Sequence, residues 1–543
     1  MQTSSMKKFK LILALGLVTA VFTLVACQTN EPATPLAAAT SQPSHTPAPT
    51  IVVAETPRAV ETAVPTSTPS PTTTQTNTPR PTKTSTPTQT PFPNLVWNDE
   101  LIQVATFDSR EVSWSPVKNE LLINSCDIRL DFEENPAEVI FHAEAPNFEK
   151  RNITPSEYHC DYSAAFSWNP DGTRLILVGS NPQENYYFNQ LWVFETTHFD
   201  GRIFNSEISW TIFPIDWMNN NTAVVGGRCG TGCTFAVMFD MHTEKSLASG
   251  SLGSIQDVTE NYVATTFGMG TNYRNVGFLS TDPQGDYVQG YESGPNVGFL
   301  RLGENDQHPF QNSYNSSFQD WLPQTNKMLV MVGERSVMED DEEFYNLPPM
   351  SDLQLWDVET DELTLLVPDG LYGRFSPNGR YLASVIPGDS GPTMQLRQEP
   401  FDQILLEAPT LAVGHSWPSL LPFFSFSPDS HYLAFFTTTN SSQSAPANLA
   451  VVDLENIVNL WSLPVPSGDL FWSPDGTHLL YRAYDGNLTL LNVENGRTTP
   501  LTLDGGQLVH DPQWSYDGRY LSVLVDKENC FCETAVLDLR NDE

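Results

Sequence analysis

One short phrase recurs along the chain and restricts its fold more than any other feature. It reads FWSPDGTHLLY at 471–481 and returns as FSWNPDGTRLIL, GRFSPNGRYLAS, FSFSPDSHYLAF and PQWSYDGRYLSV. In SPDG at 473–476, proline presets φ at the second position and glycine suits the fourth, which predicts a type I turn. The bulky residues before this turn and the apolar run after it predict two antiparallel strands joined there.

Each unit continues with two more predicted strands. In the same unit the apolar segment NLTLLNV follows, and Asn495-Gly496 favours a type I′ hairpin into RTTPLTL. One unit is therefore four short antiparallel strands. The aromatic or apolar residue just before the first turn marks nine units, at Trp114, Trp168, Trp217, Val258, Trp321, Phe375, Phe426, Trp472 and Trp514.

The spacing of these nine marker residues predicts the architecture. They lie 41 to 63 residues apart, and four-stranded units repeating at about 40 to 50 residues indicate the blades of a β-propeller, with insertions at the longer spacings. The unit of Val258 is the weakest, because its turn lacks proline and glycine. We predict an all-β fold, a single β-propeller of four-stranded antiparallel blades, eight or nine in number, with seven as the alternative.

The two ends of the repeat region complement each other. The last unit stops after its third strand, ETAVLDLR at 533–540, and ELIQVAT at 100–106 resembles the fourth strands ELTLLVP and QILLEAP. We expect this N-terminal strand to join the last blade and close the ring, because it pairs an edge that would otherwise be exposed. The propeller domain is thus predicted at 94–543.

The WSPDG turn followed by an apolar strand resembles the TolB-like, WD-repeat-like β-propeller repeat of bacterial proteins. The resemblance covers most of residues 95–543 and is strongest in the units of Trp168, Phe375, Phe426, Trp472 and Trp514. Such propellers serve as periplasmic partner-binding proteins and as gating domains of serine peptidases. The resemblance implies no functional residue, because the matching positions are turn and core residues.

The N-terminus predicts export and a lipid anchor. Three lysines precede an apolar run at 11–25, which has the length of a signal-peptide core and falls short of the about 20 residues of a membrane span. The run ends in LVAC, which resembles the bacterial lipobox. The resemblance implies that residues 1–26 are a lipoprotein signal peptide and that Cys27 carries the diacylglyceryl and palmitate chains of the anchor. The alternative is an ordinary cleaved signal with an incidental cysteine.

The segment that follows the lipidated cysteine cannot form a core. Residues 28–93 contain 14 prolines and 19 threonines, with three acidic and three basic side chains. As a coil this segment would span very roughly 45 Å. We interpret 27–93 as the lipidated cysteine and a disordered linker that holds the propeller clear of a bacterial membrane, at the cell surface or the outer membrane, or serves only as a tether.

The charge distribution restricts the partners. The chain has a net charge of −38, of which residues 1–26 carry +3 and the linker 0, so that −41 remains for residues 94–543. This acidic domain argues against nucleic acid and against direct docking on anionic lipid. It favours cationic ligands or divalent ions, or it serves solubility alone.

Six further cysteines lie in the exported domain, and an even number there suggests disulfides. We predict that Cys126 pairs with Cys160 and Cys229 with Cys233, because these loops emerge on the face opposite the SPDG turns. A Cys530–Cys532 bond would close a tight ring. Zinc is the alternative, but CGTGC and CFC lack well-spaced histidines.

The same face receives long insertions, and loops on a rigid scaffold commonly carry function. Tyr186, Tyr187 and Phe188 form a candidate aromatic platform for a sugar or peptide, and the acidic run at 339–343 is a candidate cation attractor. The alternative for the aromatic residues is packing within their own loop, and the alternative for the acidic run is a solvated loop tip without a ligand. The acidic run lacks the alternating ligands of an EF-hand.

No catalytic constellation stands out. There is no phosphate-binding loop, dinucleotide fingerprint or HExxH motif, and no cofactor is implied. We therefore expect a non-catalytic binding or protein-interaction module of the cell envelope, with an extracytoplasmic protein, peptide or glycan as its ligand. The alternatives are an envelope hydrolase acting on glycans or peptides and a TolB-like envelope-assembly component.

Overall fold

A computed structural model gives the fold of the propeller region. The residues that it describes are 96–109, 111–126, 139–158, 166–180, 189–204, 211–228, 234–252, 254–267, 280–281, 287–288, 296–304, 307–310, 315–333, 351–388, 391–410, 424–438, 447–465, 468–482, 487–501, 503, 509–526 and 532–541. All regular elements in these ranges are β-strands. A search of the same residues finds no helix of the length and hydropathy that a membrane span requires.

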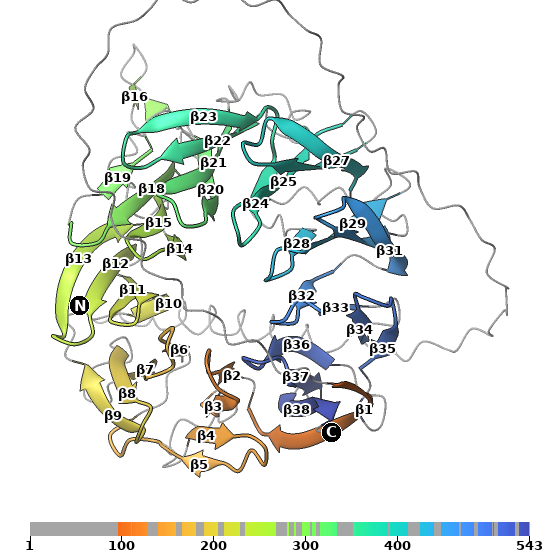
Figure 1. Cartoon of the computed structure of the whole chain (residues 1–543). Coiled ribbons are helices and arrows are strands. Elements are labelled where there is room, and N and C mark those ends of the chain that lie inside the picture. The colour runs from red at the N-terminus through yellow and green to blue at the C-terminus, as the bar shows by residue number, and fades with distance from the viewer. Residues whose placement is uncertain are drawn as a thin grey trace, which may run out of the picture.

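The described residues form nine four-stranded antiparallel sheets, numbered here as blades 1 to 9, which lie around a ring (Figure 1). Blade 1 consists of β2 (Glu111–Trp114), β3 (Glu120–Asn124), β4 (Ile140–Glu144) and β5 (Arg151–Asn152). Blade 2 consists of β6 (Phe166–Trp168), β7 (Arg174–Ser180), β8 (Asn189–Glu195) and β9 (Asp200–Phe204). Blade 3 consists of β10 (Thr211–Asn219), β11 (Thr222–Arg228), β12 (Thr234–Asp240) and β13 (Lys245–Leu252).

Blades 4 to 6 follow the same order. Blade 4 consists of β14 (Ser254–Val258), β15 (Tyr262–Phe267), β18 (Asn296–Arg301) and β19 (Gln307–Pro309), with the pair β16 (Ser280–Thr281) and β17 (Tyr287–Val288) inserted. Blade 5 consists of β20 (Asn315–Leu322), β21 (Lys327–Gly333), β22 (Ser351–Asp357) and β23 (Glu362–Val367). Blade 6 consists of β24 (Tyr372–Phe375), β25 (Tyr381–Ile386), β26 (Thr393–Gln398) and β27 (Gln403–Pro409).

Blades 7 to 9 come last in the chain. Blade 7 consists of β28 (Phe424–Phe426), β29 (Tyr432–Thr438), β30 (Ala447–Asp453) and β31 (Val458–Val465). Blade 8 consists of β32 (Leu470–Trp472), β33 (His478–Arg482), β34 (Leu488–Asn492) and β35 (Thr498–Pro500). Blade 9 consists of β36 (Val509–Trp514), β37 (Tyr520–Asp526), β38 (Cys532–Asn541) and the N-terminal strand β1 (Val96–Phe107).

The two ends of the described chain meet in blade 9. There β1 pairs antiparallel with β38, from Val96 opposite Asn541 to Phe107 opposite Thr534. The sheet therefore has the order β1-β38-β37-β36, and its outer strand comes from the start of the domain. The predicted all-β propeller of four-stranded antiparallel sheets is confirmed.

The recurring phrase forms the predicted type I turn. The amide of Gly476 donates to the carbonyl of Ser473 at 2.9 Å, and Gly476 adopts a φ of 70°. One carboxylate oxygen of Asp475 organises the turn, since it accepts the Ser473 hydroxyl at 2.6 Å and the Thr477 amide at 3.1 Å. The fourth position is glycine here because the chain leaves the turn in the left-handed region.

The predicted type I′ hairpin at Asn495-Gly496 is wrong. That turn needs two consecutive residues with positive φ, and only Gly496, at 72°, has one. The outer hairpins instead use longer turns that end in a single left-handed residue, which leads into the fourth strand. Eight blades share this feature, at Phe148, Phe199, Glu244, Gly303, Asp361, Phe401, Ile457 and Gly496.

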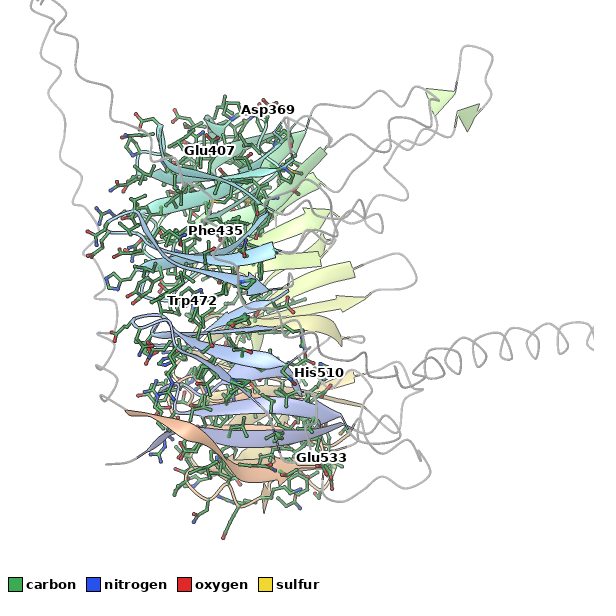
Figure 2. All side chains as sticks on the ribbon, turned by 90° about the vertical axis from the view of Figure 1, so that its right-hand side faces the viewer. Asp369, Glu407, Phe435, Trp472, His510 and Glu533 are labelled. Carbon is green, nitrogen blue, oxygen red and sulfur yellow. The ribbon has the colours of Figure 1, made fainter. Side chains whose placement is uncertain are left out.

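Each blade packs its apolar faces against its neighbours, so the core is a set of seams between blades. The seam between blades 8 and 9, for example, buries Leu480, Leu490, Leu521 and Val523 almost completely. Figure 2 shows the side chains of the described residues on the ribbon, with Phe435 of one such seam labelled. Burial of this kind, at about 25 cal/mol per Å² of apolar surface, is the main favourable contribution to folding.

Polar contacts join neighbouring blades at the turns. The second oxygen of Asp475 in blade 8 accepts a hydrogen bond from Arg540 of β38 at 2.7 Å. Asp517 in the turn of blade 9 likewise accepts the side-chain amide of Asn119 in blade 1 at 2.8 Å. The turn aspartate therefore organises its own turn with one oxygen and binds the next blade with the other.

We predict that Arg540→Met will destabilise the domain more than a matched change at a peripheral pair. The Arg540 side chain is 1% exposed and paired with Asp475, and removal of one partner of a buried pair costs about 3 to 5 kcal/mol. Arg174→Met is the control, because Glu195, the partner of Arg174, is 48% exposed and such pairs contribute about 1 kcal/mol or less. Urea unfolding of both variants measures the difference. An equal loss of unfolding free energy in the two variants would contradict a stabilising role of the Arg540–Asp475 pair.

Candidate functional site

The first strand of each blade lies nearest the centre of the ring (Figure 1). On each of these inner strands one residue immediately precedes the marker residue. In chain order these nine residues are Ser113, Ser167, Asp216, Asp257, Asp320, Arg374, Ser425, Phe471 and Gln513. All four ionisable residues of this set fall in the consecutive blades 3 to 6. We call Asp216, Asp257 and Asp320 the inner carboxylates.

Strand geometry positions these side chains. Successive side chains of a strand point to opposite faces, and the marker residues face the preceding blade: the indole N–H groups of Trp168 and Trp217 donate to the carbonyls of Ser113 and Ser167, one blade back, at 3.4 and 3.3 Å. The residue before a marker therefore faces the following blade.

Asp320 shows this arrangement directly. One of its oxygens accepts the backbone N–H of Trp321 at 3.0 Å, and the other accepts the backbone N–H of Phe375 in blade 6 at 2.8 Å. It thus joins β20 to β24. The Arg374 side chain, beside Phe375 on β24, donates to the Tyr372 hydroxyl at 2.5 Å.

The inner carboxylates influence one another. Burial raises the pKa of Asp216, and the charge of Asp257 raises it further. Burial also raises the pKa of Asp257, although the hydrogen bond from the Val258 amide and the charge of Arg374 oppose this shift. The pKa of Asp320 is raised to about 6, chiefly by burial, although the Phe375 amide and Arg374 oppose the shift and Asp257 adds to it.

The pKa of the cation at the end of this row, Arg374, is also raised, which favours its charged form. Burial acts to lower the pKa of Arg374, but Tyr372, Asp320 and Asp257 outweigh it and raise the pKa. Arg374 nevertheless remains exposed to solvent. The row therefore consists of three half-buried acids that resist ionisation and one arginine that stays charged.

This arrangement is suited to a positively charged group. Half-buried carboxylates with raised pKa values become easier to ionise when a cation approaches, so the binding of a cation and the release of a proton are coupled. In the part of the chain that the structure describes, no group of three or more histidine, cysteine, aspartate or glutamate side chains is arranged to hold a metal ion.

Most of the residues singled out from the sequence lie outside the described residues. These are Cys27, Tyr186, Tyr187, Phe188, Cys160, Cys229, Cys233 and Cys530, and the acidic run at 339–343. The predicted aromatic platform, the lipidation site and the disulfide pairings therefore remain predictions.

Two of the cysteines are described. Cys126 follows β3, is 9% exposed and is disulfide-bonded, and Cys532 begins β38. Both positions lie at the ends of strands opposite the first turn of the blade. Figure 2 shows this polarity of the ring, with Trp472, which precedes such a turn, toward one edge, and with His510 and Glu533 toward the other.

The comparisons with known proteins find no family and only solved structures of low similarity. No family model matches the chain, and no curated protein matches it. Among solved structures, a eukaryotic initiation factor is similar at 12% identity over 74% of this chain and 89% of that chain, with a TM-score of 0.45. The C-terminal WD40 domain of Sif2 is similar at 10% identity over 81% of this chain and 99% of that domain, with a TM-score of 0.42. TolB from Acinetobacter baumannii is similar at 12% identity over 59% of this chain and 81% of that chain, with a TM-score of 0.27.

The inner carboxylates were not found from the sequence. The domain is rich in aspartate and glutamate, and no spacing rule distinguishes three of them in advance. A signal was nevertheless present, because each of the three immediately precedes a marker residue in consecutive repeats. Alignment of the repeats on that position would have shown them together.

We predict that acidification will stabilise the domain through Asp320. Its pKa in the folded protein, about 6, lies above the ordinary 3.8, so the folded state binds the proton more tightly than the unfolded state. Stability from this group is present at low pH and is lost as the pH rises through about 6. In Asp320→Asn the gain in unfolding free energy between pH 7 and pH 5 should fall by about 1 kcal/mol.

The measurement is urea unfolding at pH 7 and pH 5. Asp402→Asn makes the same chemical change at an exposed residue and should keep the gain of the wild-type protein. The pH prediction fails if Asp320→Asn shows the same gain as well.

Proposed function

We propose that this protein is a non-catalytic binding module of the bacterial cell envelope that receives a basic group of a partner protein or peptide at the inner carboxylates. The observation that supports this most strongly is the position of Asp216, Asp257 and Asp320 on three successive inner strands, with the pKa of each raised by burial. The charge of Asp257 also raises the pKa of Asp216 and of Asp320, and a bound cation would oppose this repulsion between like charges.

The location that we propose comes from the N-terminal pattern. A signal peptide at 1–26, a lipid on Cys27 and the proline- and threonine-rich linker would hold the propeller outside the membrane. The lipid anchor would then be the only contact with the membrane. An acidic domain of this charge is repelled by anionic lipid, which is consistent with a partner in the surrounding envelope or medium.

The alternative of an envelope hydrolase rests on Asp320, since a carboxyl group with a pKa of about 6 is suited to general acid catalysis. Its two oxygens, however, accept backbone N–H groups from β20 and β24, which is typical of a structural role. Turnover of a glycan or peptide panel by the purified protein would favour the hydrolase. A stable envelope protein partner would instead favour the TolB-like assembly role.

We predict that the double variant Asp216→Asn/Asp257→Asn will lose affinity for basic peptides. The probe is a set of lysine- and arginine-containing peptides titrated into the purified full-length protein by calorimetry. Loss of two carboxylates facing the cation should weaken binding about tenfold or more. Asp402→Asn, which removes an exposed carboxylate elsewhere, should leave the affinity within about twofold of the wild-type value.

The same titration tests the coupling to protons. At pH 6 a bound cation should displace the proton of Asp320, so the observed heat should vary with the ionisation enthalpy of the buffer. Equal affinity in the double variant, or a heat independent of the buffer, would contradict binding at the inner carboxylates.

We also predict that Cys27→Ala will abolish attachment to the membrane. The thiol of Cys27 is the proposed site of lipidation, and two or more acyl chains give stable anchoring where one gives only marginal binding. Fractionation of cells that express the wild-type protein and the variant should place the wild-type protein with membranes and the variant in the soluble fraction. Membrane association of the variant would refute the anchor.

A further inference from the structure

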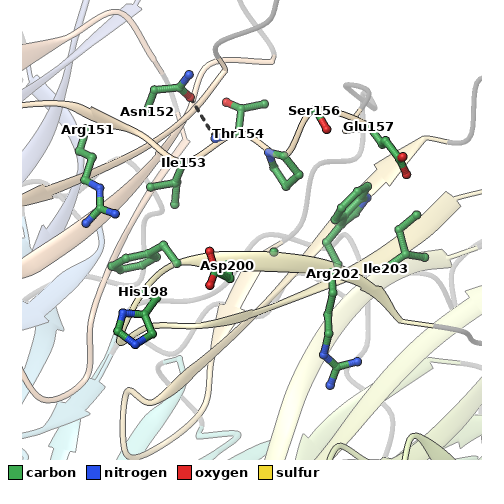
Figure 3. Close-up of a pocket in the computed structure, with 14 residues that line it drawn as sticks. Arg151, Asn152, Ile153, Thr154, Ser156, Glu157, His198, Asp200, Arg202 and Ile203 are labelled. Atoms are coloured by element: carbon green, nitrogen blue, oxygen red, sulfur yellow. Dashed lines mark hydrogen bonds between the residues drawn. The ribbon is translucent and has the colours of Figure 1, made fainter.

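A groove of about 530 Å³ lies at the outer rim of the ring, between blades 1 and 2. Figure 3 shows its two walls: the end of β5 with the segment 153–157 on one side, and β9 on the other. The groove exists because β5 is only two residues long, so that the outer strand of blade 1 ends early. This volume lies in the range of about 300 to 1,000 Å³ that is typical of ligand sites.

The pattern of lining residues indicates that the groove follows strand edges. Every residue from 151 to 157 and from 200 to 203 contributes to its walls. A pocket on one face of a strand is lined by alternate residues, because side chains alternate between faces. An unbroken run instead means that the backbone itself borders the groove. Among the described strands β9 pairs only with β8, so its outer edge offers unpaired N–H and C=O groups.

The floor of the groove contains a polar group without a partner. Trp192 of β8 lines the groove and is 3% exposed, and its buried indole N–H has no acceptor among the residues that the structure describes. Gly201 of β9 keeps the walls close, because a Cβ there would lie 2.6 Å from the Phe194 ring and 2.8 Å from Pro155. A buried donor without an acceptor is unfavourable, and a ligand carbonyl that reached the Trp192 indole would satisfy it.

The charges of the groove differ from one end to the other. Arg151 lies at one end of the wall formed by 151–157, and Glu157 lies at the other (Figure 3). Both side chains are exposed, and neither has a side-chain hydrogen bond or ion pair with another described residue. Arg202 of β9, in contrast, is engaged in an ion pair with Glu244 of blade 3.

We propose that this groove binds an extended segment of a partner protein, which adds to the edge of β9 as a further strand. Main-chain hydrogen bonds to β9 would supply affinity, as in other cases of β-strand addition. An acidic side chain of the segment would pair with Arg151, and a basic side chain toward its other end would pair with Glu157. The groove is separate from the inner carboxylates, so the two sites can be tested independently.

The test begins with a displayed library of short random peptides selected against the full-length protein. The enriched peptides should carry an acidic residue, and Arg151→Glu should weaken their binding about tenfold or more. Lys245→Glu makes the same reversal of charge on the outer strand of blade 3, where Lys245 is exposed, and should leave binding within about twofold. Asp216→Asn/Asp257→Asn should leave it unchanged as well.

Hydrogen exchange distinguishes strand addition from other kinds of binding. A bound peptide should slow exchange of the amides at 200–204, and methylation of the peptide's backbone nitrogens should abolish both the slowing and the binding. The proposal is overturned if no peptide is enriched, if Arg151→Glu binds as well as the wild-type protein, or if exchange at 200–204 does not change.

Two other occupants give different results, and either would overturn the proposal. If the protein's own linker filled the groove, deletion of 28–93 would speed exchange at 200–204 in the absence of any peptide. If the groove were a glycan site, a neutral oligosaccharide such as maltoheptaose would bind without slowing the β9 amides.

Discussion

The hydrogen bonds of the first turns in blades 8 and 9 show how the closing part of the ring is held together. In the SPDG turn of blade 8, Asp475 accepts hydrogen bonds from Ser473 and Thr477 with one oxygen and from Arg540 of blade 9 with the other. A local turn and a contact between blades are thus fixed by a single carboxylate. Each blade contacts mainly its two neighbours, as in other repeat architectures, and the contact of Asp517 in blade 9 with Asn119 in blade 1 repeats this arrangement at the next junction.

The alternation of side chains along the inner strands also places ionisable residues near the centre of the ring. A marker residue that faces the preceding blade requires the residue before it to face the following one. In most blades that residue is serine, glutamine or phenylalanine, and there the position serves packing and hydrogen bonding. In blades 3 to 5 it is aspartate, so burial collects three like charges on one arc of the inner strands. Burial of charge without a full partner is costly, and we therefore connect this arc with the proposed recognition of a basic group.

The outer strands differ from the inner strands in the groups that they present. At the rim the backbone edges are the dominant feature, and proteins commonly protect such edges with charge, short strands or covering segments. Blade 9 gains its outer strand from the N-terminus, through the pairing of β1 with β38. Blade 1 ends in the two residues of β5, which leaves the edge of β9 beside an open groove. The proposed strand addition would complete this part of the rim as β1 completes blade 9.

The sequence alone determined the repeat, because turn chemistry and strand periodicity are local and need no knowledge of distant contacts. From these came the four-stranded units, the type I turn at Ser473 and the strand at 100–106 as a partner for the last blade. The type I′ hairpin at Asn495-Gly496 failed, because the dipeptide fits more than one turn and the geometry of the outer strands selected the longer one. Only the tertiary structure decided which acids of an acidic domain lie together. Asp216, Asp257 and Asp320 are 41 and 63 residues apart in sequence, and their mutual effect on pKa arises from the ring that brings neighbouring inner strands into contact. The groove at the rim was equally unpredictable, since it depends on where β5 ends relative to β9.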